Sequence, residues 1–209
     1  MKSFLYIALL FLIFGFTTAP DDFKPVKDTE KIKAKIIEKA KSTRTIRSDF
    51  TQEKHLTMFE EVLKSKGEFL FSKPNKVRWE YTEPISYIIV LDGKRVKIKD
   101  DGKVKSYDMD SNPVFREINR LLVNSLSGEI LSNKDFRIEY FGNKDSWMAR
   151  LYPNNEDMKQ VIDNIEIYFN KIDYGVTGLR INEYSKDFTL ISFQNRILNE
   201  DIDNSAFKL

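Results

Sequence analysis

The sequence contains no cysteine, which excludes disulfides, cysteine-ligated metal sites and a lipid-modified amino-terminal cysteine. It contains a single histidine, His55, so a histidine-based metal cluster and a cysteine–histidine nucleophilic pair are excluded as well. Glycine and proline are scarce, with 8 and 6 residues, which argues against a disordered or low-complexity chain. The fold must therefore be held by a hydrophobic core, and we expect neither a metal nor a cofactor.

An excess of either charge is also missing, since 34 lysines and arginines are balanced by 32 acidic residues, for a net charge of +2. Proteins that bind nucleic acid usually carry a basic face or stripe, so we do not expect a nucleic-acid partner. Aromatic residues, by contrast, make up 13% of the chain, with 16 Phe and 9 Tyr. With 209 residues, the chain can bury a sizeable core in one or at most two domains.

Motifs of known catalytic sites are missing too. The sequence has no G-x-S-x-G elbow, and its Ser-x-x-Lys motif, at 205–208, lies at the very end of the chain. Residues 108–113 imitate the start of a calcium loop, but Pro113 stands where that loop requires glycine and Asn119 where it requires glutamate. Neighbouring acidic residues such as Glu60 and Glu61 fit solvated charges. We therefore expect a protein that is not an enzyme.

The amino-terminal segment has the three-part pattern of a secretory signal peptide. Lys2 precedes an apolar run over residues 4–16, and the small residues Thr17 and Ala19 follow. A membrane anchor is the alternative, but the run is shorter than the ~20 residues that a spanning helix needs. We expect residues 1–19 to be a signal peptide and the mature protein to be soluble in a bacterial periplasm.

Alternation of apolar and polar residues with a period of two dominates the rest of the chain and predicts a mostly antiparallel meander. The expected strands are residues 45–56, 62–72, 76–82, 87–92, 95–99, 104–108, 135–141, 146–152, 160–170, 174–184 and 188–195. Asp-Gly pairs at 92–93 and 101–102 suit tight hairpins between them. Residues 55–65 fit either a hairpin or a helical turn, and we favour the hairpin.

Two segments have helical periodicity instead. Residues 28–41 form an amphipathic helix, with Asp28 or Thr29 as its N-cap, and residues 112–127 form a second. A sheet of about eleven strands curls, and the helices can bury their apolar stripes by covering its hollow. The predicted fold is mainly β with α lids, an unclosed antiparallel β-barrel over a hydrophobic cavity. The lid residues that we expect are Ile32, Ile36, Phe115, Ile118 and Leu122.

An aromatic face characterises the strand within residues 72–84, where Val77, Trp79 and Tyr81 point to one side. Such a face is either ordinary sheet core or the wall of a ligand cavity, and periodicity does not separate the two. The residues that we expect to line an acyl-chain cavity are Phe50, Phe69, Phe71, Val77, Trp79, Tyr81, Ile88 and Val90.

Three motifs together suggest a family: SDFTQEK at 48–54, GEFLFSKPNKVRWEYTEP at 67–84 and IIVLDGKRV at 88–96. With the secretory leader and the lysine-rich first helix, they resemble the periplasmic outer-membrane lipoprotein carrier (LolA-like) family. The similarity covers residues 28–209, as one domain. It implies an open barrel with helical lids and a hydrophobic cavity, in which the face of Val77 lines the cavity.

The resemblance also implies a function and partners. Members of the family shield lipoprotein acyl chains and carry them, without a cofactor, from an inner-membrane ABC-type complex to an outer-membrane receptor, and we expect a monomer. Lys73 occupies a position that is commonly arginine, where the side chain hydrogen-bonds the lid helices. Lysine lacks the planar fork of donors, so the latch is expected to be weaker, different or absent here. A glycolipid carrier and a lipid-sensing regulator on the same fold are the alternatives.

Overall fold

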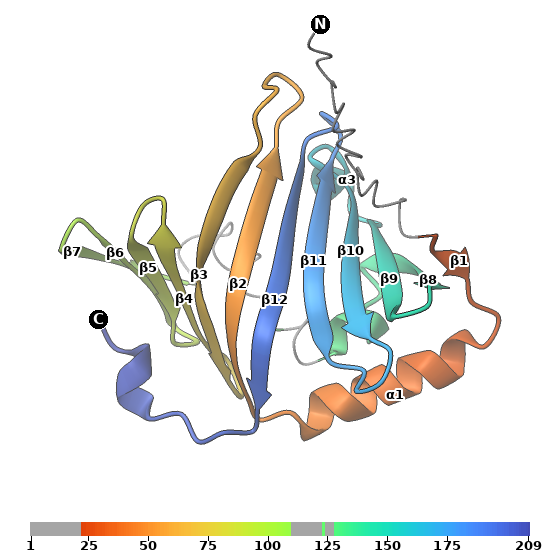
Figure 1. The fold of residues 1–209 in the computed structure, drawn as a ribbon, viewed down its shortest axis with the longest axis horizontal. Coiled ribbons are helices and arrows are strands. Elements are labelled where there is room, and N and C mark those ends of the chain that lie inside the picture. The colour runs from red at the N-terminus through yellow and green to blue at the C-terminus, as the bar shows by residue number, and fades with distance from the viewer. Residues whose placement is uncertain (1–21, 110–122, 124–127) are drawn as a thin grey trace, which may run out of the picture.

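The computed structural model describes residues 22–109, 123 and 128–209, and its main feature is a single antiparallel sheet (Figure 1). The strands are β1 (Lys24–Pro25), β2 (Thr45–His55), β3 (Leu63–Ser72), β4 (Lys76–Glu83), β5 (Tyr87–Leu91), β6 (Arg95–Asp100), β7 (Lys103–Asp108), β8 (Phe136–Gly142), β9 (Ser146–Pro153), β10 (Ile162–Asn170), β11 (Val176–Glu183) and β12 (Phe188–Leu198). Their order in the sheet is β1-β8-β9-β10-β11-β12-β2-β3-β4-β5-β6-β7. The sheet is open, because β1 and β7 lie at opposite edges.

The eleven predicted strands are confirmed, and β1 is an addition. β1 has two residues and pairs with β8 through Lys24 and Pro25, in a segment that lacks alternation. The hairpin expected over residues 55–65 is also confirmed, since β2 and β3 pair antiparallel on either side of it.

Helix α1 (Thr29–Ser42) confirms the first predicted helix, and the Asp28 side chain accepts a hydrogen bond from the Lys31 amide at its start. The other described helical elements are the short α3 (Glu156–Lys159), η1 (Glu129–Ser132) and η2 (Asn204–Phe207). In the described part of the chain, no helix has both the length and the apolar character needed to span a membrane. The predicted signal peptide lies outside the described residues. So does the predicted helix over 112–127, apart from Val123, and with it Phe115, Ile118 and Leu122.

The inner face of the sheet, defined here as the face that carries α1, holds two clusters of buried apolar side chains. The helix cluster joins Ile32 and Ile36 of α1 to η1 and strands β8–β10, with Phe136, Leu151 and Phe169 among its members. The aromatic cluster occupies the inner face of β2–β6 and β12. Leu179 of β11 packs against both, so the apolar inner face is continuous across the sheet.

The outer face has a small core of its own, which corrects two of the sequence predictions. Val90 is buried there with Leu70 and Phe207, and Ile88 packs against them. The prediction that Ile88 and Val90 line the cavity is therefore wrong. Both faces of β5 are apolar because the carboxy-terminal segment with η2 covers its outer side.

Candidate functional site: the inner apolar face

The aromatic cluster brings together the six other predicted cavity residues. They are buried on the inner face of three adjacent strands: Phe50, Phe69, Phe71, Val77, Trp79 and Tyr81. The strand register explains this, because Phe69 lies opposite Trp79 and Phe71 opposite Val77. The rings of Phe50 and Phe69 each meet the Trp79 ring edge-on, with centroids 5.1 Å apart.

Sequence reasoning missed other members of this face. Leu91 and Val96 are buried in the cluster, and Tyr87 and Ile89 pack against it. Tyr87 stacks on Tyr81 with ring centroids 4.3 Å apart. Ile89 lies opposite Trp79 in the pairing of β4 with β5, so the odd-numbered residues of β5 share the face of Trp79.

Few polar atoms interrupt the cluster. The Tyr81 hydroxyl donates to Gln52 Oε1 over 2.9 Å, and burial raises the pKa of Tyr81 well above its ordinary value. The indole N–H of Trp79 is buried and has no hydrogen-bond partner within the described part of the chain. The face is therefore an apolar wall, suited to contact with hydrocarbon.

One end of the sheet, called the closed end here, is covered by the carboxy-terminal half of α1. The Lys73 ammonium donates to the carbonyl oxygens of Ala40 and Lys41, over 2.7 and 2.9 Å. Burial lowers the pKa of Lys73, and the nearby Glu129 carboxylate opposes that shift. Lysine thus reaches the last turn of α1 without a planar fork, at the helix end where a cation is favourable.

Replacing Lys73 by methionine is expected to loosen this end of α1. The loss of two hydrogen bonds from a half-buried ammonium should lower the free energy of unfolding by about 1 kcal/mol. Amide exchange near Thr43 should accelerate more than exchange in β10, as measured by hydrogen–deuterium exchange. Lys76→Met is the control, because Lys76 instead donates to Asn204, near the carboxy terminus. Equal exchange in both variants would show that Lys73 does not hold the helix.

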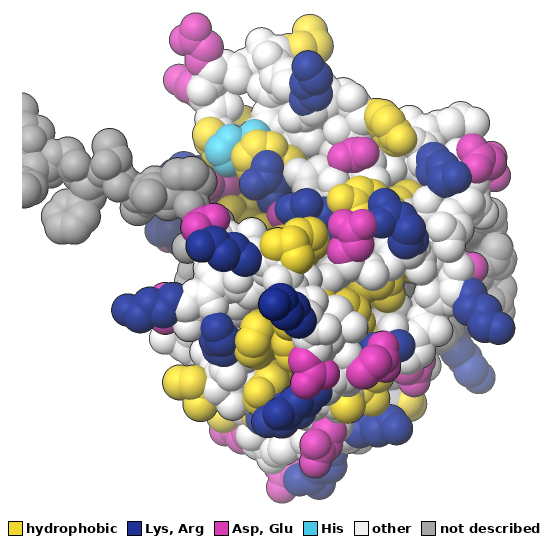
Figure 2. Space-filling view, turned by 90° about the vertical axis from the view of Figure 1, so that its right-hand side faces the viewer, with side chains coloured by type: hydrophobic (Ala, Val, Ile, Leu, Met, Phe, Trp, Pro, Cys, Tyr) yellow, Lys and Arg dark blue, Asp and Glu magenta, His cyan; other side chains and the backbone are white. Residues whose placement is uncertain are grey.

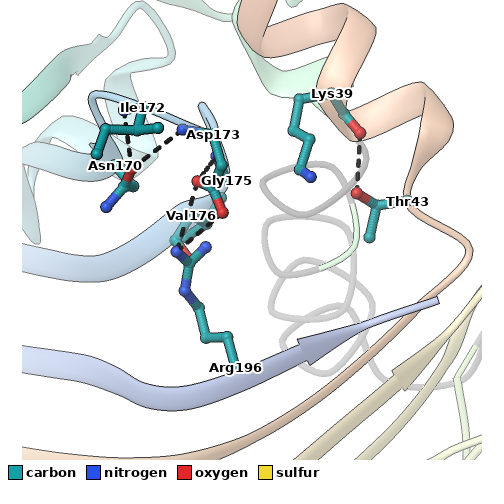
Figure 3. A network of polar contacts seen from close by, with 8 residues as sticks. All are labelled: Lys39, Thr43, Asn170, Ile172, Asp173, Gly175, Val176 and Arg196. Carbon is teal, nitrogen blue, oxygen red and sulfur yellow. Dashed lines mark hydrogen bonds and ion pairs between the residues drawn. The ribbon is translucent and has the colours of Figure 1, made fainter. Parts of the chain in front are cut away.

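The turn between β10 and β11 completes the closed end (Figure 3). Arg196 donates to the Val176 carbonyl and pairs with Asp173, while the Asn170 side chain accepts from the amides of Ile172 and Asp173. The void between α1 and this turn measures about 20 Å³. That is about the space of one water molecule, so an acyl chain has no passage there.

A wider hollow of about 760 Å³ lies between α1, η1 and β8, with Leu131, Phe136 and Tyr140 in its wall. The Tyr140 hydroxyl has no hydrogen-bond partner among the described residues. Burial raises the pKa of Tyr140 to about 12, and the Glu30 carboxylate adds to the shift. This hollow lies beside the inner face at the β8 edge, and its wall combines apolar side chains with polar ones such as Glu30 and Lys33.

Tyr140 should make stability fall at alkaline pH. The folded state holds the phenol proton more tightly than the unfolded state, whose tyrosine pKa is about 10. The contribution is thus complete below about pH 10 and is lost as the pH rises through about 12. Between about pH 10 and pH 12, the free energy of unfolding of Tyr140→Phe should fall less than that of the wild type. Urea titrations at each pH measure this free energy. Tyr184→Phe, at an exposed site, is the control, and an equal slope in all three proteins would contradict the assignment.

The surface outside these clusters is mixed. On the face shown in Figure 2, basic and acidic side chains are interspersed, with hydrophobic ones between them. Among the described residues, no group of three or more histidine or acidic side chains is placed to hold a metal ion. The inner apolar face, which carries six of the predicted site residues, is the candidate site.

Comparison with known proteins agrees with this architecture. The family model described as outer membrane lipoprotein carrier protein LolA matches residues 41–209. The chain belongs to this family. An outer-membrane lipoprotein carrier protein of Methylococcus capsulatus is 28% identical over 175 residues, which cover 80% of this chain and 77% of that protein. A protein of the same description from Francisella tularensis subsp. tularensis is 28% identical over 184 residues, which cover 83% and 81% of the two chains.

Solved structures confirm the fold of this LolA family member. An uncharacterized conserved protein from Thermus thermophilus superposes with a TM-score of 0.53 at 11% identity, covering 88% of this chain and 94% of that one. The predicted resemblance to the LolA family and the predicted open half-barrel are thus both confirmed.

Proposed function

We propose that this protein carries lipoproteins across the periplasm by shielding their acyl chains against the inner apolar face. The observation that carries the proposal is the continuous apolar surface from β8 to β6, with its aromatic cluster and its helix cover. Membership of the LolA family and the relatives named as lipoprotein carriers support a carrier role. The residues proposed to contact acyl chains are Phe50, Phe69, Phe71, Val77, Trp79 and Tyr81, together with Tyr87 and Ile89.

The physical need for such a carrier is the cost of exposing hydrocarbon to water. Each methylene costs about 0.8 kcal/mol, so a chain of a dozen carbons costs on the order of 10 kcal/mol. An apolar wall offsets most of this cost, and no catalytic group is required. Reversible binding then depends on α1, because its Ile32 and Ile36 cover the β8–β10 part of the inner face and compete with any cargo that extends there.

The route follows from the same proposal. Residues 1–19 direct export, an inner-membrane ABC-type complex loads the carrier, and a receptor at the outer membrane accepts the cargo. Lys73 acts as the latch that holds α1 over the inner face until cargo arrives, as its bonds to the last turn of the helix suggest.

Depletion of the protein tests this function directly. Membranes are separated by density after depletion, and the distribution of lipoproteins between them is measured. Retention of lipoproteins at the inner membrane is expected, and their normal arrival at the outer membrane would contradict the proposal. Mass spectrometry of molecules that copurify with the protein separates the alternatives, because a carrier of glycolipid or a lipid sensor would retain free lipids in place of lipoproteins.

A further inference from the structure

Exposed apolar side chains gather at the end of the sheet that lies opposite the closed end. Of the eleven large hydrophobic residues that are exposed in the described part of the chain, six lie on or beside the turns at this end. These six, called the apolar rim, are Met58, Phe59, Leu63, Ile85, Val161 and Tyr184. Met58 is 89% exposed, Ile85 67% and Phe59 65%, so none of the three contributes much to the core.

The turns of the apolar rim lie side by side. The Thr57 amide donates to Asp187 Oδ1 over 2.7 Å, which ties the β2–β3 turn to the β11–β12 turn. The Tyr184 amide donates to the Val161 carbonyl over 3.2 Å, which joins the turn before β10 to the same row. In Figure 1 the β2–β3 hairpin projects beyond its neighbours, away from α1. The six side chains thus lie on neighbouring turns at one end of the sheet.

The tips are held in place by their own hydrogen bonds. The Phe59 amide donates to the Leu56 carbonyl over 2.9 Å, and the Thr57 hydroxyl donates to Asp187. The Phe59 amide and the Thr57 hydroxyl already have hydrogen-bond partners within the protein. Their hydrogen bonds are therefore kept when the turns move from water into an apolar environment. The rim is a preformed surface.

The charges around the tips are of both signs. Lys64 pairs with Glu53 over 3.1 Å, and Lys66 pairs with Glu83 over 3.0 Å. Such pairs create no field that would attract a strongly charged partner. Apolar side chains that project from turn tips, with charged groups beside them, suit the boundary between lipid headgroups and acyl chains. Tyrosine, here Tyr184, is enriched at that boundary.

The inner apolar face begins directly behind this rim. Tyr81 and Tyr87, which stack in the aromatic cluster, flank the turn that carries Ile85. At the opposite end, the carboxy-terminal half of α1 lies against the β10–β11 turn and leaves a void of only about 20 Å³. A hydrocarbon chain that enters from the rim therefore meets apolar side chains at once.

We propose that the apolar rim seats the protein on the surface of a lipid bilayer, so that this end of the inner face lies at the membrane where cargo is loaded or released. The proposal rests on the carrier function and adds a docking surface to it. Because the six rim side chains are apolar and the charges around them are of both signs, with Glu60 and Glu61 beside Lys64 and Lys66, seating is driven by apolar contact, occurs on zwitterionic lipid and depends little on salt.

Flotation with phosphatidylcholine vesicles tests the proposal on the exported protein. Replacing Met58, Phe59 and Ile85 together by serine should weaken vesicle partitioning roughly tenfold or more, because three apolar anchors are lost. The matched control is Ile172→Ser with Ile197→Ser, since both residues are exposed but lie at the closed end. The control should partition like the wild type at low and at high salt. Equal partitioning of the rim variant and the wild type would overturn the proposal, as would a wild-type protein that does not float.

A site-specific probe gives a second readout, since the chain has no native cysteine. An environment-sensitive fluorophore on Met58→Cys should brighten when vesicles are added, whereas the same fluorophore on Ile172→Cys should not. Brightening at neither position, or at Ile172→Cys alone, contradicts rim docking. Binding of a fluorescent fatty acid is measured separately without vesicles. If the wild type does not bind the fatty acid, the carrier function is refuted. If the rim variant binds the fatty acid as the wild type does, docking is separated from cargo binding.

Discussion

Replacing Gly67 by alanine is expected to lower the free energy of unfolding by about 3 kcal/mol or more. Gly67 lies at the register shift between β3 and β4, where the two backbones approach closely. A Cβ atom there would sit 1.8 Å from the Glu80 carbonyl oxygen and 2.8 Å from the Phe50 ring. The backbone cannot yield without separating the strands, so the variant should unfold at much lower urea concentration.

Gly102→Ala is the control for this prediction. Gly102 lies in the β6–β7 turn with a φ of 74° and no atom within 4 Å of an added Cβ, so alanine would strain the backbone but meet no neighbour. The expected cost is about 1 kcal/mol. If both variants lose the same free energy of unfolding, the close approach of β3 and β4 is not the reason that a glycine is needed at position 67.

Ile89→Glu is expected to weaken acyl-chain binding roughly 100-fold, since an unpaired charge against hydrocarbon costs about 3 kcal/mol. Ile89 packs against the aromatic cluster on the inner face, and its side chain is half-buried. The affinity for a fluorescent fatty acid in the absence of membranes measures the effect.

The neighbouring residue supplies a matched control for this change. Ile88 is also half-buried, but it packs with Val90 on the outer face beneath η2. Ile88→Glu should therefore destabilise the fold to a similar extent and leave fatty-acid affinity nearly unchanged. If both variants lose affinity equally, the inner face does not hold the acyl chain.

Most of the fold could be predicted from the sequence, because strands with one buried face alternate clearly. Residues 76–83 are an example, with Val77, Trp79 and Tyr81 separated by polar residues. β1 could not be predicted, since a two-residue strand that ends in Pro25 exists only through its pairing with β8. Such an element depends on tertiary contacts and leaves no periodic pattern.

The candidate site was predicted less completely. The run Tyr87–Leu91 is apolar throughout, so its pattern does not say which residues face inward. Val90 faces outward because Phe207 covers it on the outer face. The sequence does not indicate where an apolar residue near the carboxy terminus packs. For Lys73 the family resemblance left open whether a lysine contacts the lid helices at all, and its two hydrogen bonds to α1 are seen only in the fold.

β12, the last strand to be made, lies in the middle of the sheet and joins β2 to β11. Before the segment from Phe188 onward has been made, the chain can form two separate meanders, β2–β7 and β8–β11. β2 and β11 then lack the strand that pairs with both of them. Contacts of such long sequence separation form late. The two halves of the sheet can therefore be joined only after β12 has been made, so the assembly of the whole sheet has to wait for this strand.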